Sequence, residues 1–266
     1  MAIDAKTDLG LDPFFFSQGG NEIFAIHYPA SHRDEGFVFC HPAPQDMMRA
    51  HHSQVTLAKR LQNLGFPVLR FDYSGTGDST GGIVSMECWK NEILQAVSEF
   101  KKRSGLKKVS LIGSRLGASL AIMASQEIGM RRLILWDPIV SGSELLKAYS
   151  DCHHRLLNRV PDESPYPGNQ KNCEQSCGYP WPRSIQDEIA NVRPETLHTL
   201  SKMIQIVSSE ESSSLGRLIE NYRQETKEVS LQSSGENMNW AEDRYLNLRL
   251  FAPNSIRLLC QYAEES

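Results

Sequence analysis

Five consecutive residues, Gly113-Ser114-Arg115-Leu116-Gly117, have the glycine spacing of a strand-to-helix turn that presents one side chain for chemistry. In enzymes that use this turn, the apex side chain is a nucleophile, most often serine. Here the apex residue is Arg115. Arginine stays protonated at physiological pH and offers donors without a lone pair, so it cannot attack a carbonyl carbon. The motif therefore predicts a presented positive charge in the place of a nucleophile.

The elements that must position this turn are indicated by hydrophobic periodicity. Strands are expected at 13–16, 22–28, 36–40, 67–71, 108–112, 132–136, 200–207 and 228–231, and helices at 45–63, 85–100, 118–128, 215–222 and 255–262. Strands that alternate with helices of this length imply right-handed crossovers and a mostly parallel central sheet, flanked by helices on both faces. The sequence therefore predicts an α/β fold.

The regular pattern breaks between about 142 and 195. Prolines punctuate a polar stretch there, at Pro161, Pro165, Pro167, Pro180 and Pro182. A long irregular segment inside a regular α/β chain is typical of a functional lid. We expect residues 142–195 to form a small inserted cap, with residues 1–141 and 196–266 forming the core domain.

A second glycine-rich turn carries a family resemblance. Phe71-Asp72-Tyr73-Ser74-Gly75-Thr76-Gly77-Asp78-Ser79 follows a predicted strand, and the Arg115 turn comes later in the chain. With these motifs and this order of elements, the chain resembles the α/β-hydrolase superfamily over most of residues 13–262. The resemblance implies the α/β-hydrolase fold.

Shorter motifs suggest a narrower resemblance. His41-Pro42, Arg49, the Arg115 turn, Leu135-Trp136-Asp137-Pro138 and Gly178-Tyr179-Pro180 look like segments of bacterial hydrolase-like proteins associated with exosortase systems, some of which also carry arginine at the turn.

The superfamily resemblance implies places for a catalytic acid and a histidine. The acid would follow the strand that ends at Val207, where Glu210 is the nearest match, although an exposed carboxylate at a helix start explains it equally well. The histidine would lie between Ser233 and Trp240, but no histidine occurs after His198. The usual general base is therefore missing as well as the nucleophile.

The resemblance also implies an anion-binding floor made of backbone amides. The loop after His41-Pro42 supplies one donor, the N–H of Ala43, and Leu116 supplies the second. Alternatively, Leu116 merely begins a helix whose free N–H groups need solvation. Ser114 precedes the apex residue and is expected to point away from it, while His41 is a further catalytic candidate at the end of a strand.

Three interpretations of Arg115 remain open. Its guanidinium can bind a carboxylate, a phosphate or a developing oxyanion. It can instead pair with an internal acid, for which Asp46, Glu210 and Glu236 are candidates, because a buried guanidinium needs partners. It can also turn out to solvent.

Composition excludes several other classes of protein. The formal net charge is −4 over 266 residues and basic residues are scattered, so neither nucleic acid nor an anionic membrane is an expected partner. No apolar run is long enough to insert into a membrane. The six cysteines do not read as a disulfide framework, so reduced thiols and a cytoplasmic location are expected. Neither a metal nor a cofactor is expected, and whether the chain forms a homodimer is left open.

Together these patterns predict an atypical α/β-hydrolase-fold enzyme that acts on a small carbonyl- or carboxylate-bearing metabolite. The reaction would be hydrolase- or acyltransferase-like, in a biosynthetic setting, with Arg115, Glu210 and His41 as catalytic candidates. Ser114, Leu116, Ala43, Asp46 and Glu236 would contact the substrate. The alternative is a catalytically inactive pseudo-hydrolase that binds a ligand or a partner protein.

Overall fold

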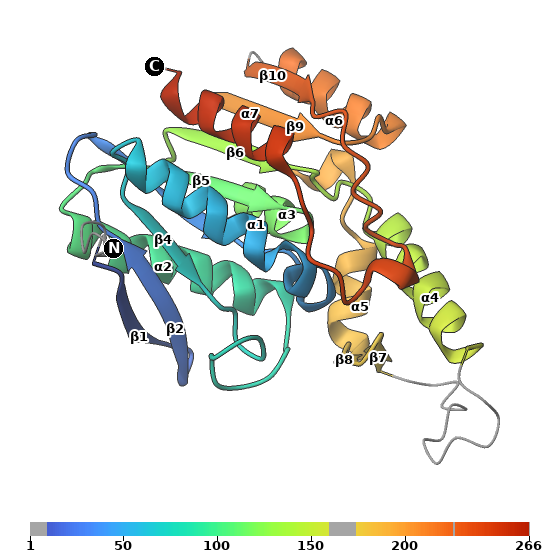
Figure 1. The fold of residues 1–266 in the computed structure, drawn as a ribbon. Helices are drawn as coiled ribbons and strands as arrows, with labels where there is room; N and C mark the ends of the chain where they lie inside the picture. The colour runs from blue at the N-terminus through green and yellow to red at the C-terminus, as the bar shows by residue number, and fades with distance from the viewer. Residues whose placement is uncertain (1–9, 160–173, 226, 266) are drawn as a thin grey trace, which may run out of the picture.

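A computed structural model describes residues 10–159, 174–225 and 227–265 (Figure 1). Within these residues, eight strands form one sheet in the order β1-β2-β4-β3-β5-β6-β9-β10. The β1–β2 and β2–β4 pairs are antiparallel, and the other neighbouring strands are parallel. The strands are β1 (Asp12–Gln18), β2 (Asn21–Tyr28), β3 (Glu35–Cys40), β4 (Val68–Phe71), β5 (Lys108–Ser114), β6 (Arg132–Trp136), β9 (Met203–Ser208) and β10 (Glu228–Ser233). The predicted α/β fold with a mostly parallel sheet is confirmed.

Helices cover both faces of this sheet (Figure 1). The side chains of β3 alternate between two cores, Val38 and Cys40 facing one and Phe37 and Phe39 the other. Burial on both faces explains why these strands are apolar throughout. No helix in the described part of the chain is long and apolar enough to cross a lipid bilayer. α1 (Pro44–Asn63) and α7 (Pro253–Glu264) pack on one face, and α2 (Met86–Ser104), α3 (Leu116–Ala124) and α6 (Ser213–Gln224) pack on the other.

The cap segment, residues 142–195, connects β6 to the last part of the core. Its described residues form α4 (Gly142–Leu157), a hairpin of β7 (Gln175–Ser176) and β8 (Tyr179–Pro180), α5 (Arg183–Ala190) and part of the short 3-10 helix η1 (Pro194–Thr196). The N–H of Gly142 donates to the carbonyl of Val192 at 2.9 Å, so the two ends of the segment meet. A Cβ at Gly142 would collide with the carbonyl of Ile189, which requires glycine at this crossing.

Helix α4 corrects the prediction that the regular pattern breaks at residue 142. Its buried residues Gly142, Leu145, Tyr149 and Cys152 follow helical spacing on one face. The other faces are mostly polar, so the stretch reads as a polar loop although one face packs inward. The three prolines between 161 and 167 lie outside the described residues.

Two predicted boundaries are also corrected. β9 begins at Met203 rather than at residue 200, and α3 ends at Ala124 rather than at residue 128. The hydroxyl of Ser125, just after α3, shares a hydrogen bond of 2.6 Å with the hydroxyl of Thr199. This contact joins the end of α3 to the loop that precedes β9.

A buried ion pair lies at the amino ends of the strands. Arg132, the first residue of β6, donates through Nε and Nη2 to Glu35, the first residue of β3, at 2.9 and 2.6 Å. Its Nη1 donates to the carbonyls of Tyr262 and Glu265 at 2.8 and 2.6 Å. Arg132 therefore joins two strands to the end of α7. This ion pair lies at the amino ends of the strands, whereas the Arg115 turn lies at their carboxyl ends.

Candidate functional site

Arg115 occupies a strained turn between β5 and α3. Its φ of 54° and ψ of −125° fall in a region that residues other than glycine rarely adopt. The flanking glycines allow the close packing that this turn requires. A Cβ at Gly113 would meet Ala118, and one at Gly117 would collide with the carbonyls of Cys40 and His41. The local geometry predicted from the motif is therefore present with arginine at the apex.

The Arg115 side chain contacts an internal acid and an aromatic ring. Its Nε donates to Asp46 Oδ2 at 3.1 Å, and its Cζ lies 4.9 Å from the centroid of the Trp240 ring. Burial alone would lower the pKa of Arg115, but Asp46, Tyr149 and Asp137 together outweigh it and raise the pKa, with Asp46 contributing most. The guanidinium therefore stays charged, as the ion-pair interpretation requires.

Asp46 reaches Arg115 from the first turn of α1. Its side chain is 1% exposed, and an acid in the first turn is favourable at the positive end of a helix. Tyr149, on α4, lies near the same carboxylate. Burial, together with the charge of Asp46, raises the pKa of Tyr149 well above its ordinary value. Asp46 is thus the internal partner of Arg115 and is covered by the cap segment.

Asp137 and Trp240 form a second polar contact beside Arg115. Asp137 follows β6 with a φ of 45°, and its Oδ2 accepts the indole N–H of Trp240 at 2.9 Å. Its Oδ1 accepts the backbone N–H of Ser209 at 2.6 Å. Trp240 lies at the end of the stretch in which a histidine is expected. Neither residue was predicted as a site residue from the sequence, although Asp137 directly follows a predicted strand.

Arg49, on α1, holds the loop that carries Trp240. Its Nη1 donates to the carbonyl of Asn239 at 2.6 Å, and its Nη2 donates to that of Met238 at 2.8 Å. The Arg49 Cζ lies 5.7 Å from the Trp240 ring centroid. Burial is the main cause of the lowered pKa of Arg49. Trp240 is therefore fixed between α1 and the Arg115 turn.

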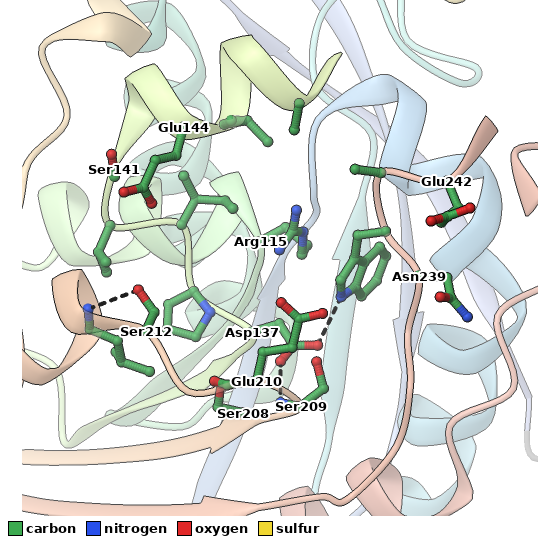
Figure 2. Close-up of a pocket in the computed structure, with 18 of the residues that line it drawn as sticks. Arg115, Asp137, Ser141, Glu144, Ser208, Ser209, Glu210, Ser212, Asn239 and Glu242 are labelled. Atoms are coloured by element: carbon green, nitrogen blue, oxygen red, sulfur yellow. Dashed lines mark hydrogen bonds between the residues drawn. The ribbon is translucent and has the colours of Figure 1, made fainter. Parts of the chain in front are cut away.

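A cavity of about 750 Å³ opens on one side of these residues. Arg115, Asp137 and Trp240 line it together with Glu144 and Arg155 of α4 and Glu210 of the loop after β9 (Figure 2). Figure 2 shows Glu144 and Glu210 approaching the cavity from opposite sides, with Arg115 between them. Glu210 is exposed, and its carboxylate forms no hydrogen bond or ion pair within the described residues. The structure thus brings Arg115 and Glu210 together at one cavity.

His41 and Ser114 lie in a buried chain of hydrogen bonds and not in the lining of this cavity. His41 Nδ1 donates to Gln54 Oε1 at 2.5 Å, and Gln54 Nε2 donates to Ser114 Oγ at 2.9 Å. Burial lowers the pKa of His41 to about 3, and the charge of Arg70 adds to this effect. The placement runs against the prediction of His41 as a catalytic residue, because the strand end that carries it is packed beneath α1.

Ala43 and Leu116, the predicted oxyanion donors, are at most 2% exposed and are not part of the cavity lining. Neither amide forms a hydrogen bond within the described residues. The contact between Arg115 and Asp46 bridges the two loops that carry these amides. The loops are therefore adjacent, as the resemblance implies, but their donors are covered.

Glu236 is placed away from Arg115, contrary to its selection as a substrate contact. Its carboxylate accepts the backbone N–H groups of Asn254 and Ser255 at 2.8 and 2.9 Å, and the Ser255 hydroxyl at 2.7 Å. These groups lie at the start of α7, where the first N–H groups lack partners within the helix. Glu236 therefore acts as a cap of α7.

Comparisons with known proteins support the fold. No protein-family model matches the chain, and no curated protein matches its sequence. A candidate hydrolase from Agrobacterium vitis S4 has a similar structure, with a TM-score of 0.61 and 18% identity over 97% of this chain and 98% of that chain.

Two further solved structures are similar. Est1E from Butyrivibrio proteoclasticus, bound to ferulic acid, has a TM-score of 0.60 and 15% identity over 95% of this chain and 100% of its own. An alpha-beta serine hydrolase homologue from Coxiella burnetii has a TM-score of 0.52 and 15% identity over 84% of this chain and 86% of its own. The protein described above therefore has the α/β-hydrolase fold, and its structural neighbours include hydrolases and esterases.

Proposed function

We propose that this protein binds a small carbonyl- or carboxylate-bearing metabolite in the cavity beside Arg115, without acyl-enzyme chemistry. The observation that carries the proposal is how the guanidinium is used. Nε contacts Asp46, whereas the two Nη groups form no hydrogen bond within the described residues. The side chain is 14% exposed and reaches the cavity (Figure 2). Two adjacent Nη donors suit a carboxylate.

Acyl-enzyme chemistry is disfavoured by three residues of the site. Arg115 has no lone pair to attack a carbonyl carbon, and the indole N–H of Trp240 donates without being able to accept a proton. Asp137 already accepts two hydrogen bonds, from Trp240 and Ser209. The set can bind and orient a ligand, but it cannot activate a serine by the usual route.

The narrower resemblance to exosortase-associated hydrolase-like proteins fits this proposal. Arg49, Arg115 and Asp137 belong to the motifs that suggested it, and all three surround Trp240. Three of those motifs thus meet at Trp240. A biosynthetic role and a cytoplasmic location stay predictions, as does the separation of residues 142–195 as a cap.

The test is calorimetric titration with sodium salts of short aliphatic and aromatic monocarboxylates, and with the matching neutral amides. Carboxylates should bind more tightly than amides. Arg115→Ala should weaken carboxylate binding by roughly 1.5 to 3 kcal/mol, about 10- to 150-fold, because a charged contact is lost. Arg244→Ala is the matched control, because Arg244 also lines the cavity but pairs with Glu242 at 3.1 Å. Equal carboxylate affinity in wild type and Arg115→Ala contradicts the proposal.

Catalysis without a nucleophilic serine is the second candidate function. The observation that favours it is Glu210, whose exposed carboxylate lines the same cavity as Arg115. Glu210 would activate a water molecule, and Arg115 would stabilise negative charge on an ester or thioester carbonyl. Glu210→Gln should then lower kcat at least 100-fold, whereas Glu144→Gln should not. Turnover unaffected by Glu210→Gln rules out this mechanism, and labelling by a fluorophosphonate probe would reveal an ordinary serine esterase instead.

A further inference from the structure

Two cysteine sulfurs meet in the cap segment, between α4 and the turn that joins β7 to β8. Cys152 Sγ and Cys177 Sγ lie 3.6 Å apart. Cys152 belongs to the buried face of α4, and Cys177 lies in the turn between β7 and β8. Neither cysteine lines the cavity beside Arg115. A separation of 3.6 Å is close enough for a bond to form after small side-chain rotations.

Hydrogen bonds on both sides hold the turn against α4. The backbone N–H of Cys177 donates to His153 Nδ1 at 3.2 Å. The hydroxyl of Ser176 is 3.3 Å from both the carbonyl of Tyr149 and Oε1 of Gln45. These hydrogen bonds join Cys177 and the residue next to it to residues near Cys152. They therefore help to keep the two sulfurs in contact.

The backbone of Cys177 is unusual for this residue type. Ser176 pairs with Tyr179, so Cys177 and Gly178 are the two central residues of a tight hairpin turn. Their φ angles are 51° and 90°. Turns with both central residues at positive φ favour Asn-Gly or Gly-Gly, since other side chains are strained there. A cysteine is therefore present where folding alone favours asparagine or glycine.

We propose that Cys152 and Cys177 are a redox-modified pair, which hydrogen peroxide converts to a disulfide. Cys177 is partly exposed and Cys152 is fully buried, so Cys177 reacts first. The Cys177 thiolate attacks one peroxide oxygen and the O–O bond breaks, so that a sulfenic acid forms and the leaving hydroxide takes up the proton lost from Cys177 to give one water. The Cys152 sulfur then attacks Cys177 Sγ, the S–O bond breaks, and the leaving hydroxide takes the proton lost from Cys152 to form a second water. Two thiols and one peroxide thus give one disulfide and two waters.

The bond would join α4 to the β7–β8 hairpin. Glu144, Leu145 and Ala148 of the same helix line the cavity. Oxidation would therefore restrict the helix that forms one wall of the cavity. This inference goes beyond the proposed ligand site and does not depend on it.

The experiment treats the reduced full-length protein with one equivalent of hydrogen peroxide and measures intact mass and tryptic peptides. The expected result is the loss of about 2 Da and a linked peptide joining Cys152 to Cys177, both reversed by dithiothreitol. Cys152→Ser and Cys177→Ser should each abolish the link, with circular dichroism confirming that both variants fold. Cys88→Ser, which removes a partly exposed thiol elsewhere, should leave it intact.

The alternative is a link through Cys173, which precedes Cys177 in the sequence and lies outside the described residues. Cys173→Ser tests this alternative. The link should form normally in that variant. Loss of the link in Cys173→Ser, or oxygen added to Cys177 with no cross-link, would overturn the proposal. As a second readout, oxidation should raise the Tm of the wild type and leave the Tm of Cys152→Ser unchanged.

Discussion

Trp240 donates its indole N–H to Asp137 Oδ2 at 2.9 Å across 103 positions of sequence. In hydrolases of this fold, a histidine donates to its acid in the same way. An indole reproduces that hydrogen bond, but it has no second nitrogen to take a proton from a nucleophile. The contact therefore keeps an acid and an aromatic ring together beside Arg115, but Trp240 cannot act as a general base.

Exchanging Arg115 and Trp240 tests whether the Trp240–Asp137 pair can be replaced by a histidine–acid pair. Arg115→Ser alone should not create esterase activity, because no histidine is present to activate the new serine. Arg115→Ser combined with Trp240→His should raise the hydrolysis of p-nitrophenyl acetate at least 10-fold above the single variant. Initial rates at pH 8 measure this difference.

Asp137→Asn in the double variant is the matched control. It should return the rate to that of Arg115→Ser, because the histidine loses its orienting carboxylate. Equal rates for the single and double variants would show that the Trp240 place does not correspond to a catalytic histidine.

The depressed pKa of His41 predicts a pH dependence of stability. The folded pKa of about 3 lies below the ordinary value of 6.5. Between these values the unfolded chain binds a proton that the folded chain does not, so the free energy of unfolding falls as pH falls below 6.5. The slope approaches at most about 1.4 kcal/mol per pH unit from this residue.

Urea denaturation between pH 7.5 and 4.5 measures this contribution. His41→Gln should lose less stability than wild type over that interval, since it lacks the titrating group. His52→Gln, at an exposed position of α1, is the control and should follow the wild type. If the free energy of unfolding had the same pH dependence in wild type and in His41→Gln, His41 would not be a neutral buried residue in the folded protein.

The ion pair at the amino ends of the strands should be important for stability. Arg132→Met leaves Glu35 buried without its main partner, and we expect a loss of about 3 to 5 kcal/mol in urea denaturation. Arg131 also lies near Glu35, at 3.3 Å, but its side chain is 31% exposed. Arg131→Met should therefore cost less than about 1 kcal/mol. Similar losses of stability in the two variants would contradict the larger contribution that we assign to Arg132.

The capping role of Glu236 separates stability from binding. Glu236→Ala removes three acceptor contacts at the start of α7 and should lower the free energy of unfolding by about 1 to 2 kcal/mol. Carboxylate binding at Arg115 should not change in the folded variant. A loss of affinity as large as that of Arg115→Ala would restore Glu236 to the ligand site.

Periodicity predicted the central sheet well, because its inner strands, such as β3, β4 and β6, are buried on both faces and separated by glycine or polar turns. The same reasoning failed at α4, where only one side chain in three or four packs inward. Sequence propensity reflects the many polar residues of such a helix. The helix is stabilised, however, by the few residues that it packs against the rest of the protein.

The site was predictable where local motifs define it. The turn geometry at Arg115 follows from two glycines, and Asp46 was among the acids expected to pair with it. The Asp137–Trp240 contact was not predictable, because it joins loops far apart in sequence. Glu236 misled for the opposite reason: its partners, Asn254 and Ser255, are backbone groups that no side-chain pattern reveals.

The contact of Gly142 with Val192 and Ile189 sets how closely the start of α4 approaches the end of α5. Because backbone lies against backbone there, any larger side chain at position 142 would have to displace the carbonyl of Ile189. The hydrogen bond from Gly142 to Val192 joins the entry and the exit of residues 142–195, so the same substitution would also strain the point at which this segment leaves and rejoins the core.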